Sequence, residues 1–469
     1  MIRPARVVRL GRATVVSLGI AVVVAAMSGP TPAQKAVLAV LLAAAWLGSF
    51  DLAFVASRTT LAALGRGVAV LRGVVLGALI TCGIAVWLPA LALHRGDIAI
   101  LAALELALVL VWELASTRIV PPQRVLVVGS FETCIGMTAE FQRRRGLRFE
   151  LAGIVDDDAH PQARSSLLLG TGADLPQIVA DVRPDLVALA PGCNRPETFA
   201  RLLDAAQHGF KVLELAQLYE HAFGRVPVRE LTRAWFMSVL HLYQRPYSAF
   251  AKRAADIVGA LVVLLLAFPL LPLLAIVVFR TGRPIVLRQT RVGEHGRLFD
   301  MYKFRTMRPD AESAGKAVWA SRDDPRITHE GRVMRRFRLD ELPQIWNILK
   351  GEMSLVGPRP ERPEFIEELL ESVPFWERRH LVKPGITGWA QVNRGYTADT
   401  RGSLDKLSYD LWYIRHRSLT VDLVICARTL VTLIRGEWKS TGDDDQLEYD
   451  PLVSILRYTA TLEADTGQV

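Results

Sequence analysis

Cysteine is scarce in this chain, and the spacings of the common metal and redox motifs are missing. The 469 residues contain four cysteines that lie far apart, with no Cys-x-x-Cys pair. The nine histidines include no His-Glu-x-x-His sequence. Because zinc sites and disulfide frameworks need closely spaced or paired cysteines, we expect neither of them. The thiols are predicted to be free, in a reducing compartment.

Basic residues interleaved with aromatic ones, the pattern of nucleic-acid-binding surfaces, are also lacking. The formal net charge is +9, but many of the arginines flank long apolar runs instead. Hydrophobic residues make up 51% of the chain, and the mean hydropathy is +0.25. Cations beside apolar runs are typical of membrane topology and of contact with anionic lipid head groups. The composition therefore predicts a protein that binds a lipid bilayer and no nucleic acid.

Four long apolar stretches lie near the amino terminus. They cover residues 13–28, 36–56, 68–90 and 97–116. Because about 20 residues cross a bilayer, we predict a four-helix transmembrane region over residues 1–122. The first stretch is followed by another apolar run rather than by a polar mature sequence, which indicates an anchor and not a cleaved signal peptide.

The charged residues around these stretches predict their orientation. Arginines precede the first stretch, surround the second connection and follow the fourth stretch, whereas the other two connections carry only Lys35 and Arg95. By the positive-inside rule, both ends of the four-helix region face the cytoplasm. Asp51 and Glu105 lie within apolar stretches. They indicate either a polar pathway or, as we favour, polar contacts between helices or at the interface.

Residues 123–225 change to short apolar runs separated by polar helical segments. Strands are predicted to begin near Arg124, Phe149, Asp185 and Lys211, with a helix over residues 134–145. Strands that alternate with helices indicate a parallel sheet in a Rossmann-like α/β domain. Its nucleotide site is degenerate, because the Gly-x-Gly-x-x-Gly pattern counted from Gly129 meets Phe131 and Cys134 where it requires glycine. An NAD-dependent enzyme of nucleotide sugars is thus the weaker alternative.

Residues 226–250 are predicted to be a linker, and a fifth apolar run follows over residues 257–279. Basic residues flank both ends of the run, so the positive-inside rule favours no crossing direction. Pro269 and Pro272 fall near its middle, where each removes a backbone donor and favours a bend. A fifth spanning helix is one interpretation of the run. We predict instead a re-entrant helix over about residues 254–282 that enters and leaves on the cytoplasmic side.

A β-hairpin is predicted after this run, with Gly293 and Gly296 in its turn. Because strand side chains alternate between two faces, Lys303 and Arg305 are expected on the same face. Two cations on one face suit a diphosphate, although they also suit a solvated edge or lipid head groups.

An acidic pair, Asp340-Glu341, follows a group of arginines that includes Arg335. Pro343 fits only a first helical turn and Gly351 a helix stop, which predicts a helix over residues 341–350. The pair then lies at the amino end of this helix, where an anion is attracted. Asp340 is either the cap of the helix or a carboxylate that attacks phosphorus.

Four segments together carry a family resemblance. They are residues 303–307 (Lys-Phe-Arg-Thr-Met), 339–360 with Asp340-Glu341 and Pro-Arg-Pro, 383–393 (Lys-Pro-Gly-Ile-Thr-Gly-Trp-Ala-Gln-Val-Asn) and 409–422. Residues 246–437 resemble the catalytic domain of bacterial polyprenyl-phosphate sugar-1-phosphate transferases, the monotopic phosphoglycosyl transferases. The four-helix region and the α/β domain place the chain in their large subclass. The resemblance implies a mainly α monotopic catalytic domain over residues 251–440 with a re-entrant helix, followed by a flexible tail over residues 441–469.

The same resemblance implies roles for residues. Asp340 is expected to be the nucleophile and Glu341 to bind Mg²⁺. Four cations are expected to bind the substrate phosphates: Lys303, Arg305, Arg335 and Arg359. Four further residues of the matching segments are expected to contact substrate or to be structural: Asp410, Asp422, Gln391 and Asn393.

The expected reaction moves a sugar-1-phosphate from a UDP-sugar to a polyprenyl phosphate such as undecaprenyl phosphate, with release of UMP. This step would begin exopolysaccharide, capsule or O-antigen synthesis at the cytoplasmic face of the bacterial inner membrane. A homodimer is expected by analogy with large relatives. The remaining alternative is a non-enzymatic protein that assembles polysaccharide machinery.

Overall fold

The computed structural model falls into two compact units, one formed by Met1–Leu218 and the other by Tyr219–Leu447. It describes residues 3–28, 30–57, 63–91, 93–119, 121–143, 149–156, 167–191, 193, 196–228, 231, 249–309, 311, 324–393 and 400–435. The predicted tail over residues 441–469 and most of the predicted linker over residues 226–250 lie outside these ranges.

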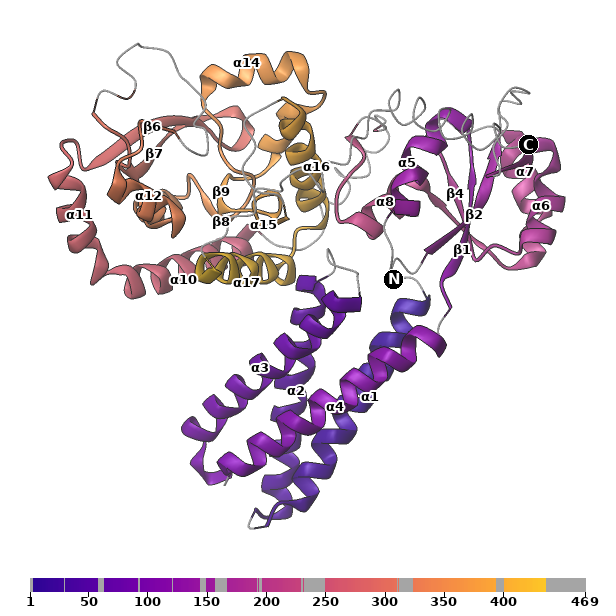
Figure 1. The fold of residues 1–469 in the computed structure, drawn as a ribbon, viewed down its shortest axis with the longest axis horizontal. Coiled ribbons are helices and arrows are strands. Elements are labelled where there is room, and N and C mark those ends of the chain that lie inside the picture. The colour runs from indigo at the N-terminus through magenta and orange to yellow at the C-terminus, as the bar shows by residue number, and fades with distance from the viewer. Residues whose placement is uncertain are drawn as a thin grey trace, which may run out of the picture. The chain divides into compact units, whose positions relative to one another are not determined.

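The first unit begins with a bundle of four long helices, drawn in indigo and violet in Figure 1. They are α1 (Arg3–Ala26), α2 (Pro32–Ser57), α3 (Ala63–Trp87) and α4 (Arg95–Ile119). Each is long and apolar enough to cross a membrane, which confirms the four predicted apolar helices. Large side chains such as Leu38, Leu42 and Trp46 fill the bundle core, and residues such as Leu79 and Leu114 are exposed on its outer surface.

Polar side chains pair between the helices of the bundle. Asp51 accepts a hydrogen bond from Arg9, and Glu113 lies 2.7 Å from the buried guanidinium of Arg12. The prediction of interhelical contacts is confirmed for Asp51. Glu105 is fully buried against α1, and its two carboxyl oxygens have no hydrogen-bond partner in the described part of the chain.

A five-stranded parallel sheet follows in the same unit, with the strand order β3-β2-β1-β4-β5. Its strands are β1 (Gln123–Val128), β2 (Phe149–Asp156), β3 (Leu168–Thr171), β4 (Leu186–Leu189) and β5 (Lys211–Glu214). Its helices are α5 (Phe131–Arg143), α6 (Leu175–Val182), α7 (Pro196–Asp204) and α8 (Leu215–Phe223). Helices α5 and α8 cover one face of the sheet, and α6 and α7 cover the other (Figure 1).

The Rossmann-like α/β class is confirmed, and four of the five strands start close to the predicted positions. Helix α5 begins at Phe131, three residues before the predicted helix. The prediction missed β3, a four-residue edge strand, because its sequence Leu-Leu-Gly-Thr is too short for a period-two pattern.

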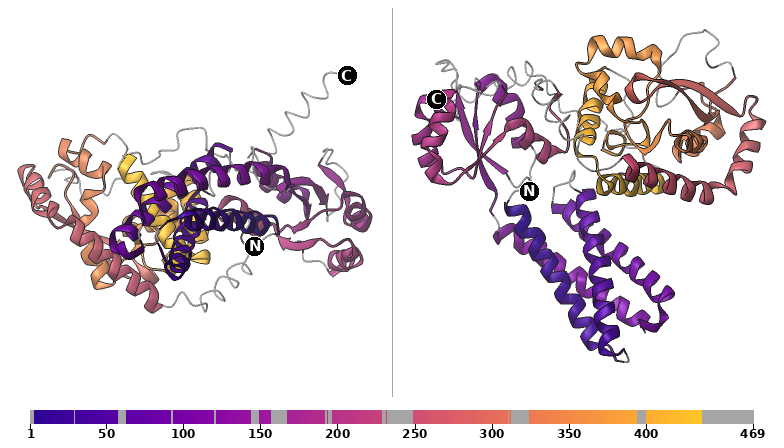
Figure 2. Two further views of the ribbon diagram at one scale, coloured as in Figure 1. Left: turned by 90° about the horizontal axis from the view of Figure 1, so that it is seen from below. Right: turned by 180° about the vertical axis from the view of Figure 1, so that it is seen from behind.

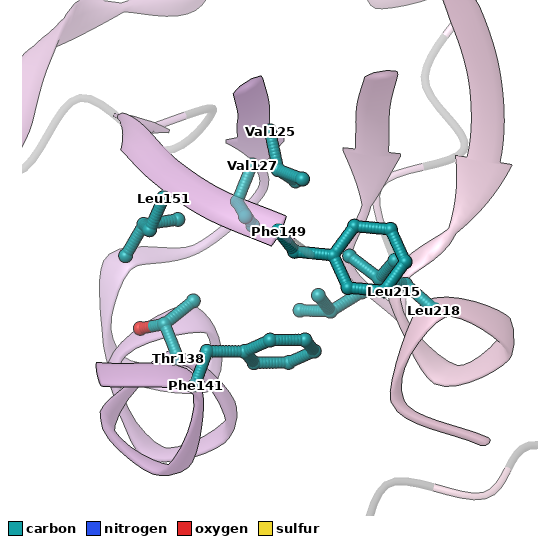
Figure 3. A pocket seen from close by; sticks show the side chains of 8 residues that line it. All are labelled: Val125, Val127, Thr138, Phe141, Phe149, Leu151, Leu215 and Leu218. Atoms are coloured by element: carbon teal, nitrogen blue, oxygen red, sulfur yellow. The ribbon is translucent and has the colours of Figure 1, made fainter. Parts of the chain in front are cut away.

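The glycine turn after β1 packs closely against Ala190, the residue after β4. Gly129 has a φ of +151°, and a Cβ there would lie 2.4 Å from the Cβ of Ala190. A small hollow of ≈ 10 Å³ between the sheet and helices α5 and α8 is lined by apolar side chains and Thr138 (Figure 3).

The second unit begins with two apolar helices, α10 (Ala249–Ala267) and α11 (Leu270–Arg280), whose axes differ by 68°. Pro269 is the residue before α11, and the amide of Phe268 still donates to Leu264 as a continuation of α10. The predicted break therefore falls at Phe268-Pro269. Leu265, Leu266 and Phe268 are exposed at the bend, so this apolar corner is not covered by the described residues.

The remainder of the unit is mainly helical, with small two-stranded sheets among the helices. A hairpin of β6 (Val286–Val292) and β7 (Leu298–Phe304) precedes α12 (His329–Arg336), the 3₁₀ turn η6 (Leu339–Gln344) and α13 (Ile345–Lys350). The later elements are β8 (Ser354–Val356), α14 (Pro363–Ser372), η7 (Trp376–Leu381), β9 (Gly385–Thr387), α15 (Trp389–Asn393), α16 (Thr400–His416) and α17 (Leu419–Arg435). Figure 2 shows α17 beside α10, where Lys252 donates to Asp422 over 2.7 Å.

The predicted helix over residues 341–350 is corrected by the structure. Pro343 lies within the 3₁₀ turn η6, and the α-helix proper begins only at Ile345. The predicted stop at Gly351 is confirmed, since this residue ends α13 with a φ of +89°. Asp340 and Glu341 therefore belong to a tight turn and not to the first turn of an α-helix, and the argument from a helix dipole no longer applies to them.

Candidate active site

The acidic pair is positioned by an unusual backbone turn. Arg338 has a φ of +51°, a left-handed conformation that costs an L-residue about 1–2 kcal/mol. This reversal directs the chain from α12 into η6 and buries both carboxylates, with Asp340 8% exposed and Glu341 6% exposed. Strained residues of this kind are concentrated at functional sites, where the surrounding contacts hold them.

The carboxylate of Glu341 is held between two guanidinium groups. Its Oε1 lies 2.8 Å from Nη2 of Arg359, and its Oε2 accepts a hydrogen bond of 3.0 Å from Nη1 of Arg338. Nη1 of Arg338 also donates to the carbonyl oxygen of Ile386 over 3.2 Å, which ties the pair to β9. Burial alone would raise the pKa of Glu341, but the charges of Arg338 and Arg359 outweigh it and lower this pKa below its ordinary value.

Asp340 has a different environment. Burial and the adjacent charge of Glu341 raise the pKa of Asp340 to about 6, although Arg335, Lys303 and Arg359 act in the opposite direction. Burial likewise lowers the pKa of Lys303 to about 8, together with the neighbouring charges of Arg291 and Arg335. A buried carboxylate surrounded by cations is therefore available at neutral pH as a nucleophile with a basicity above that of ordinary aspartate.

Three of the four predicted phosphate-binding cations surround the acidic pair. Lys303 and Arg335 influence the charge state of Asp340, and Arg359 contacts Glu341 directly. The fourth, Arg305, is directed elsewhere. It lies just beyond the end of β7, so strand alternation does not extend to it, and its side chain donates to the carbonyl oxygen of Arg283 over 2.6 Å and to the hydroxyl of Thr281 over 3.3 Å. These contacts make Arg305 a buried support for the end of α11.

The other four predicted residues are engaged within the protein. Asp410 accepts a 2.7 Å hydrogen bond from Arg379, and Asp422 binds Lys252 and the hydroxyl of Tyr413. The amide of Gln391 donates to Ile386, while Asn393 donates to Trp389 and accepts from Arg428. For these four, the geometry favours the structural alternative over contact with substrate.

Comparison with known proteins identifies the family. Residues 247–436 match the family model described as bacterial sugar transferase. The chain is also 31% identical to a UDP-glucose:undecaprenyl-phosphate glucose-1-phosphate transferase of Klebsiella pneumoniae, over 66% of this chain and 67% of that protein. The chain belongs to the bacterial sugar transferase family. The predicted kinship with polyprenyl-phosphate sugar-1-phosphate transferases is thereby confirmed.

Relatives with other sugars in their names match as well. The chain is 38% identical to a UDP-N-acetylgalactosamine-undecaprenyl-phosphate N-acetylgalactosaminephosphotransferase of Aeromonas hydrophila over 55% of its own length, and it spans 59% of that protein. It is 37% identical to an undecaprenyl-phosphate galactose phosphotransferase of Salmonella typhimurium over 40% of its length and spans 42% of that protein. Three relatives thus carry three different sugars in their names, which leaves the sugar of this family member open.

Sequence reasoning missed several residues of this sugar transferase site. Gln289 and Arg291 lie on the same face of the hairpin as Lys303, and the Oε1 of Gln289 accepts from both cations, over 2.7 Å from Arg291 and 3.1 Å from Lys303. The pairing of β6 with β7 sets Leu287 opposite Lys303, and this register places Gln289 and Arg291 on the face of Lys303. Arg338 was among the arginines noted before Asp340, but nothing in the sequence predicts its left-handed backbone.

The two shifted pKa values predict a bell-shaped pH profile for this sugar transferase. With Asp340 as the expected nucleophile and Lys303 as an expected phosphate ligand, protonation of Asp340 as the pH falls through about 6 would remove the attacking carboxylate. Deprotonation of Lys303 as the pH rises through about 8 would remove a positive charge from the site. We expect kcat/KM for the donor to decline on both sides of this window. Lys303→Arg should remove the alkaline limb alone, since arginine stays charged. An acid limb near pH 4 would contradict the raised pKa of Asp340.

Proposed function

We propose that this protein transfers a sugar-1-phosphate from a UDP-sugar to a polyprenyl phosphate, with undecaprenyl phosphate as the acceptor, and releases UMP. The observation that carries the proposal is Asp340, a buried carboxylate beside Glu341 with Lys303, Arg335 and Arg359 within electrostatic reach. The three relatives described above are each named as an undecaprenyl-phosphate sugar transferase, and their names support the acceptor and the reaction class. This reaction would be the first membrane step of exopolysaccharide synthesis.

The reaction proceeds in two displacements at one phosphorus atom. A carboxylate oxygen of Asp340 attacks the sugar-proximal phosphorus of the donor, the bond to the UMP oxygen breaks, and a phosphosugar ester of Asp340 forms. An oxygen of the polyprenyl phosphate then attacks the same phosphorus and restores the carboxylate of Asp340. Phosphoryl transfer depends mainly on positioning and charge neutralisation, which the cations Lys303, Arg335 and Arg359 supply.

Mg²⁺ fits this site as an ion that arrives with the donor. Magnesium prefers oxygen ligands and is commonly held by one or two carboxylates together with substrate phosphates. The described residues contain no group of three or more acidic, histidine or cysteine ligands, but Asp340 and Glu341 supply carboxylate oxygens. Glu341 would hold the ion, which would neutralise charge on the diphosphate.

Charge around the acidic pair predicts that metal binding depends on the nucleotide. Lys303, Arg335, Arg338 and Arg359 outnumber Asp340 and Glu341, and both oxygens of Glu341 already contact guanidinium groups. We expect Mn²⁺, as a spectroscopic substitute for Mg²⁺, to bind at least about tenfold more tightly when UDP is present.

Mn²⁺ titrations followed by electron paramagnetic resonance would measure this difference. Arg359→Ala should increase the affinity for Mn²⁺ in the absence of UDP, because it frees one oxygen of Glu341. Equal affinities with and without UDP would contradict the prediction.

The bent helices support an arrangement in which the catalytic unit lies at the membrane surface. We propose that α10 and α11 enter and leave on the cytoplasmic side, with Leu265, Leu266 and Phe268 in the lipid. This arrangement brings a water-soluble donor and a lipid acceptor to the same interface. A cysteine in place of Arg283, just beyond α11, should react with a membrane-impermeant thiol reagent from the cytoplasmic side of sealed vesicles if the helices re-enter, and from the opposite side if they make a fifth crossing.

Release of UMP tests the function directly. The full chain in lipid nanodiscs with Mg²⁺ and undecaprenyl phosphate would be given UDP-glucose, UDP-galactose and UDP-N-acetylgalactosamine in turn. Release with one donor, dependent on the acceptor lipid, is the expected result. No release with any donor from folded protein would overturn the proposal and favour the non-enzymatic assembly protein.

A further inference from the structure

The backbone of the segment that carries Arg359 is held through its carbonyl groups. Pro358 and Pro360 have no backbone N–H, so the segment has few donors of its own. Four successive carbonyl oxygens each accept a hydrogen bond, and the donors belong to three elements of the catalytic unit, β6, η7 and β9. The donors are Gly385 N to Pro358, Arg379 Nη2 to Arg359, Arg291 Nη1 to Pro360 and Val292 N to Glu361, at 2.9, 2.9, 3.1 and 3.0 Å.

Arg379 is the most deeply buried of these donors. Its side chain is 1% exposed, lies over the ring of Trp376 with 4.3 Å between the guanidinium carbon and the ring centroid, and pairs with Asp410 over 2.7 Å. The same Nη2 group that contacts Asp410 also donates to the carbonyl oxygen of Arg359. Asp410 therefore fixes the guanidinium in the position from which it holds the backbone of Arg359.

Glu361 connects this arrangement with Lys303, the other cation that is expected to bind phosphate. Its buried carboxylate binds Lys406 and lies 3.6 Å from Arg379 and 3.9 Å from Arg291. Arg291 in turn donates to Gln289, whose Oε1 also accepts from Lys303. A continuous chain of charged and polar contacts thus connects Asp410 with the backbone of Arg359 on one side and with the side chain of Lys303 on the other.

We propose that Asp410, Arg379 and Glu361 form a positioning network that sets where Arg359 meets the donor diphosphate. None of the three is assigned a contact with substrate; they act through Arg359. This inference rests on the proposed function, because it takes Arg359 as a ligand of the donor phosphates. Buried ion pairs contribute little to stability compared with apolar residues of the same size. A displacement of a substrate-binding group by about 1 Å, in contrast, weakens binding and slows catalysis. The network is therefore better explained by positioning than by stability.

The test measures UDP binding rather than turnover, by isothermal titration calorimetry of the full chain in nanodiscs. Asp410→Asn keeps the size of the side chain and removes the charge that holds Arg379. As a single substitution, with Arg359 still present, Asp410→Asn is expected to weaken UDP binding by about tenfold. In an Arg359→Ala background, the same substitution should change UDP affinity less than twofold, because the residue through which it acts is gone.

A matched control separates positioning from general stability. Glu220 is also a buried carboxylate paired with an arginine, Arg415, over 2.8 Å, but it contacts a different part of the catalytic unit. Glu220→Gln should lower the melting temperature without weakening UDP binding. Arg379→Lys provides a second test if Asp410→Asn does not fold, since lysine keeps the charge but not the two-acceptor geometry of Nη2.

The outcomes are distinct. Loss of affinity that requires Arg359 supports the network. An equal loss with and without Arg359, or an equal loss in Glu220→Gln, would overturn it. Absence of any UDP binding by the unmodified protein would instead count against the proposed function itself.

Discussion

Asp340→Asn is expected to abolish transfer while making the protein more stable. Asparagine cannot form the acyl phosphate with the sugar phosphate, so UMP release should fall by at least about 10³-fold and up to roughly 10⁶-fold, the loss that follows removal of a nucleophile in a protease. The structural reason for the gain in stability is the raised pKa of Asp340, about 6 against about 3.9 for an unperturbed aspartate. Because the folded state binds this proton more tightly, stability decreases as the pH rises from about 4 to 6. Asparagine carries no such penalty.

Two measurements check this expectation. Differential scanning calorimetry at neutral pH should give a higher melting temperature for Asp340→Asn than for the unmodified protein, with the difference vanishing below about pH 4. Intact-protein mass spectrometry of the unmodified protein, incubated with donor and without acceptor lipid, should detect a phosphosugar adduct on Asp340. An inactive variant that is also less stable would indicate damage to the fold, and turnover by the variant would rule out the covalent route.

Arg359→Ala is expected to have the second largest effect. In the proposed mechanism the substitution removes a guanidinium that would neutralise the diphosphate, and it takes the Arg359 partner from one oxygen of Glu341. Arginines that stabilise charge in phosphoryl transfer contribute about 10³-fold or more to the rate, so kcat/KM for the donor should fall by roughly that factor. Arg359→Lys should recover only a small part of the activity, because lysine lacks the planar fork that binds phosphate oxygens.

Arg362 is a control for Arg359 in the same segment. Arg362 lies three residues beyond Arg359, and its guanidinium pairs with the exposed Glu364 over 3.1 Å. Arg362→Ala should leave kcat/KM within about twofold of the unmodified protein. Similar losses for both arginines would mean that the segment as a whole, and not the guanidinium of Arg359, determines activity.

The sequence predicts those parts of the molecule that repeat a simple pattern. Apolar runs of sufficient length predict the four helices of the bundle, and alternating strands and helices predict the α/β domain. The break at Phe268-Pro269 is predictable because proline removes a backbone donor whatever surrounds it. The acidic pair and Arg359 are recognised by family resemblance and are brought together as expected, with Arg359 2.8 Å from Glu341.

The sequence does not predict features that depend on tertiary contacts. Arg305 follows Lys303 by two residues, but β7 ends at Phe304, so the alternation that would place both on one face stops between them. The turn around the acidic pair is a 3₁₀ turn entered through a left-handed Arg338, and the contacts of that arginine with Glu341 and Ile386 help to hold it. Asp410 has the residue type of a metal ligand, yet its partner Arg379 lies 31 positions away along the chain.

The burial of Asp340 has a consequence for the lifetime of the proposed intermediate. Acyl phosphates in solution are lost to water, and each such loss would consume a nucleotide sugar without product. With Asp340 8% exposed, a phosphosugar attached there is shielded from bulk solvent on the protein side. In the proposed reaction, this shielding would let the activated sugar remain on Asp340 until a lipid phosphate arrives.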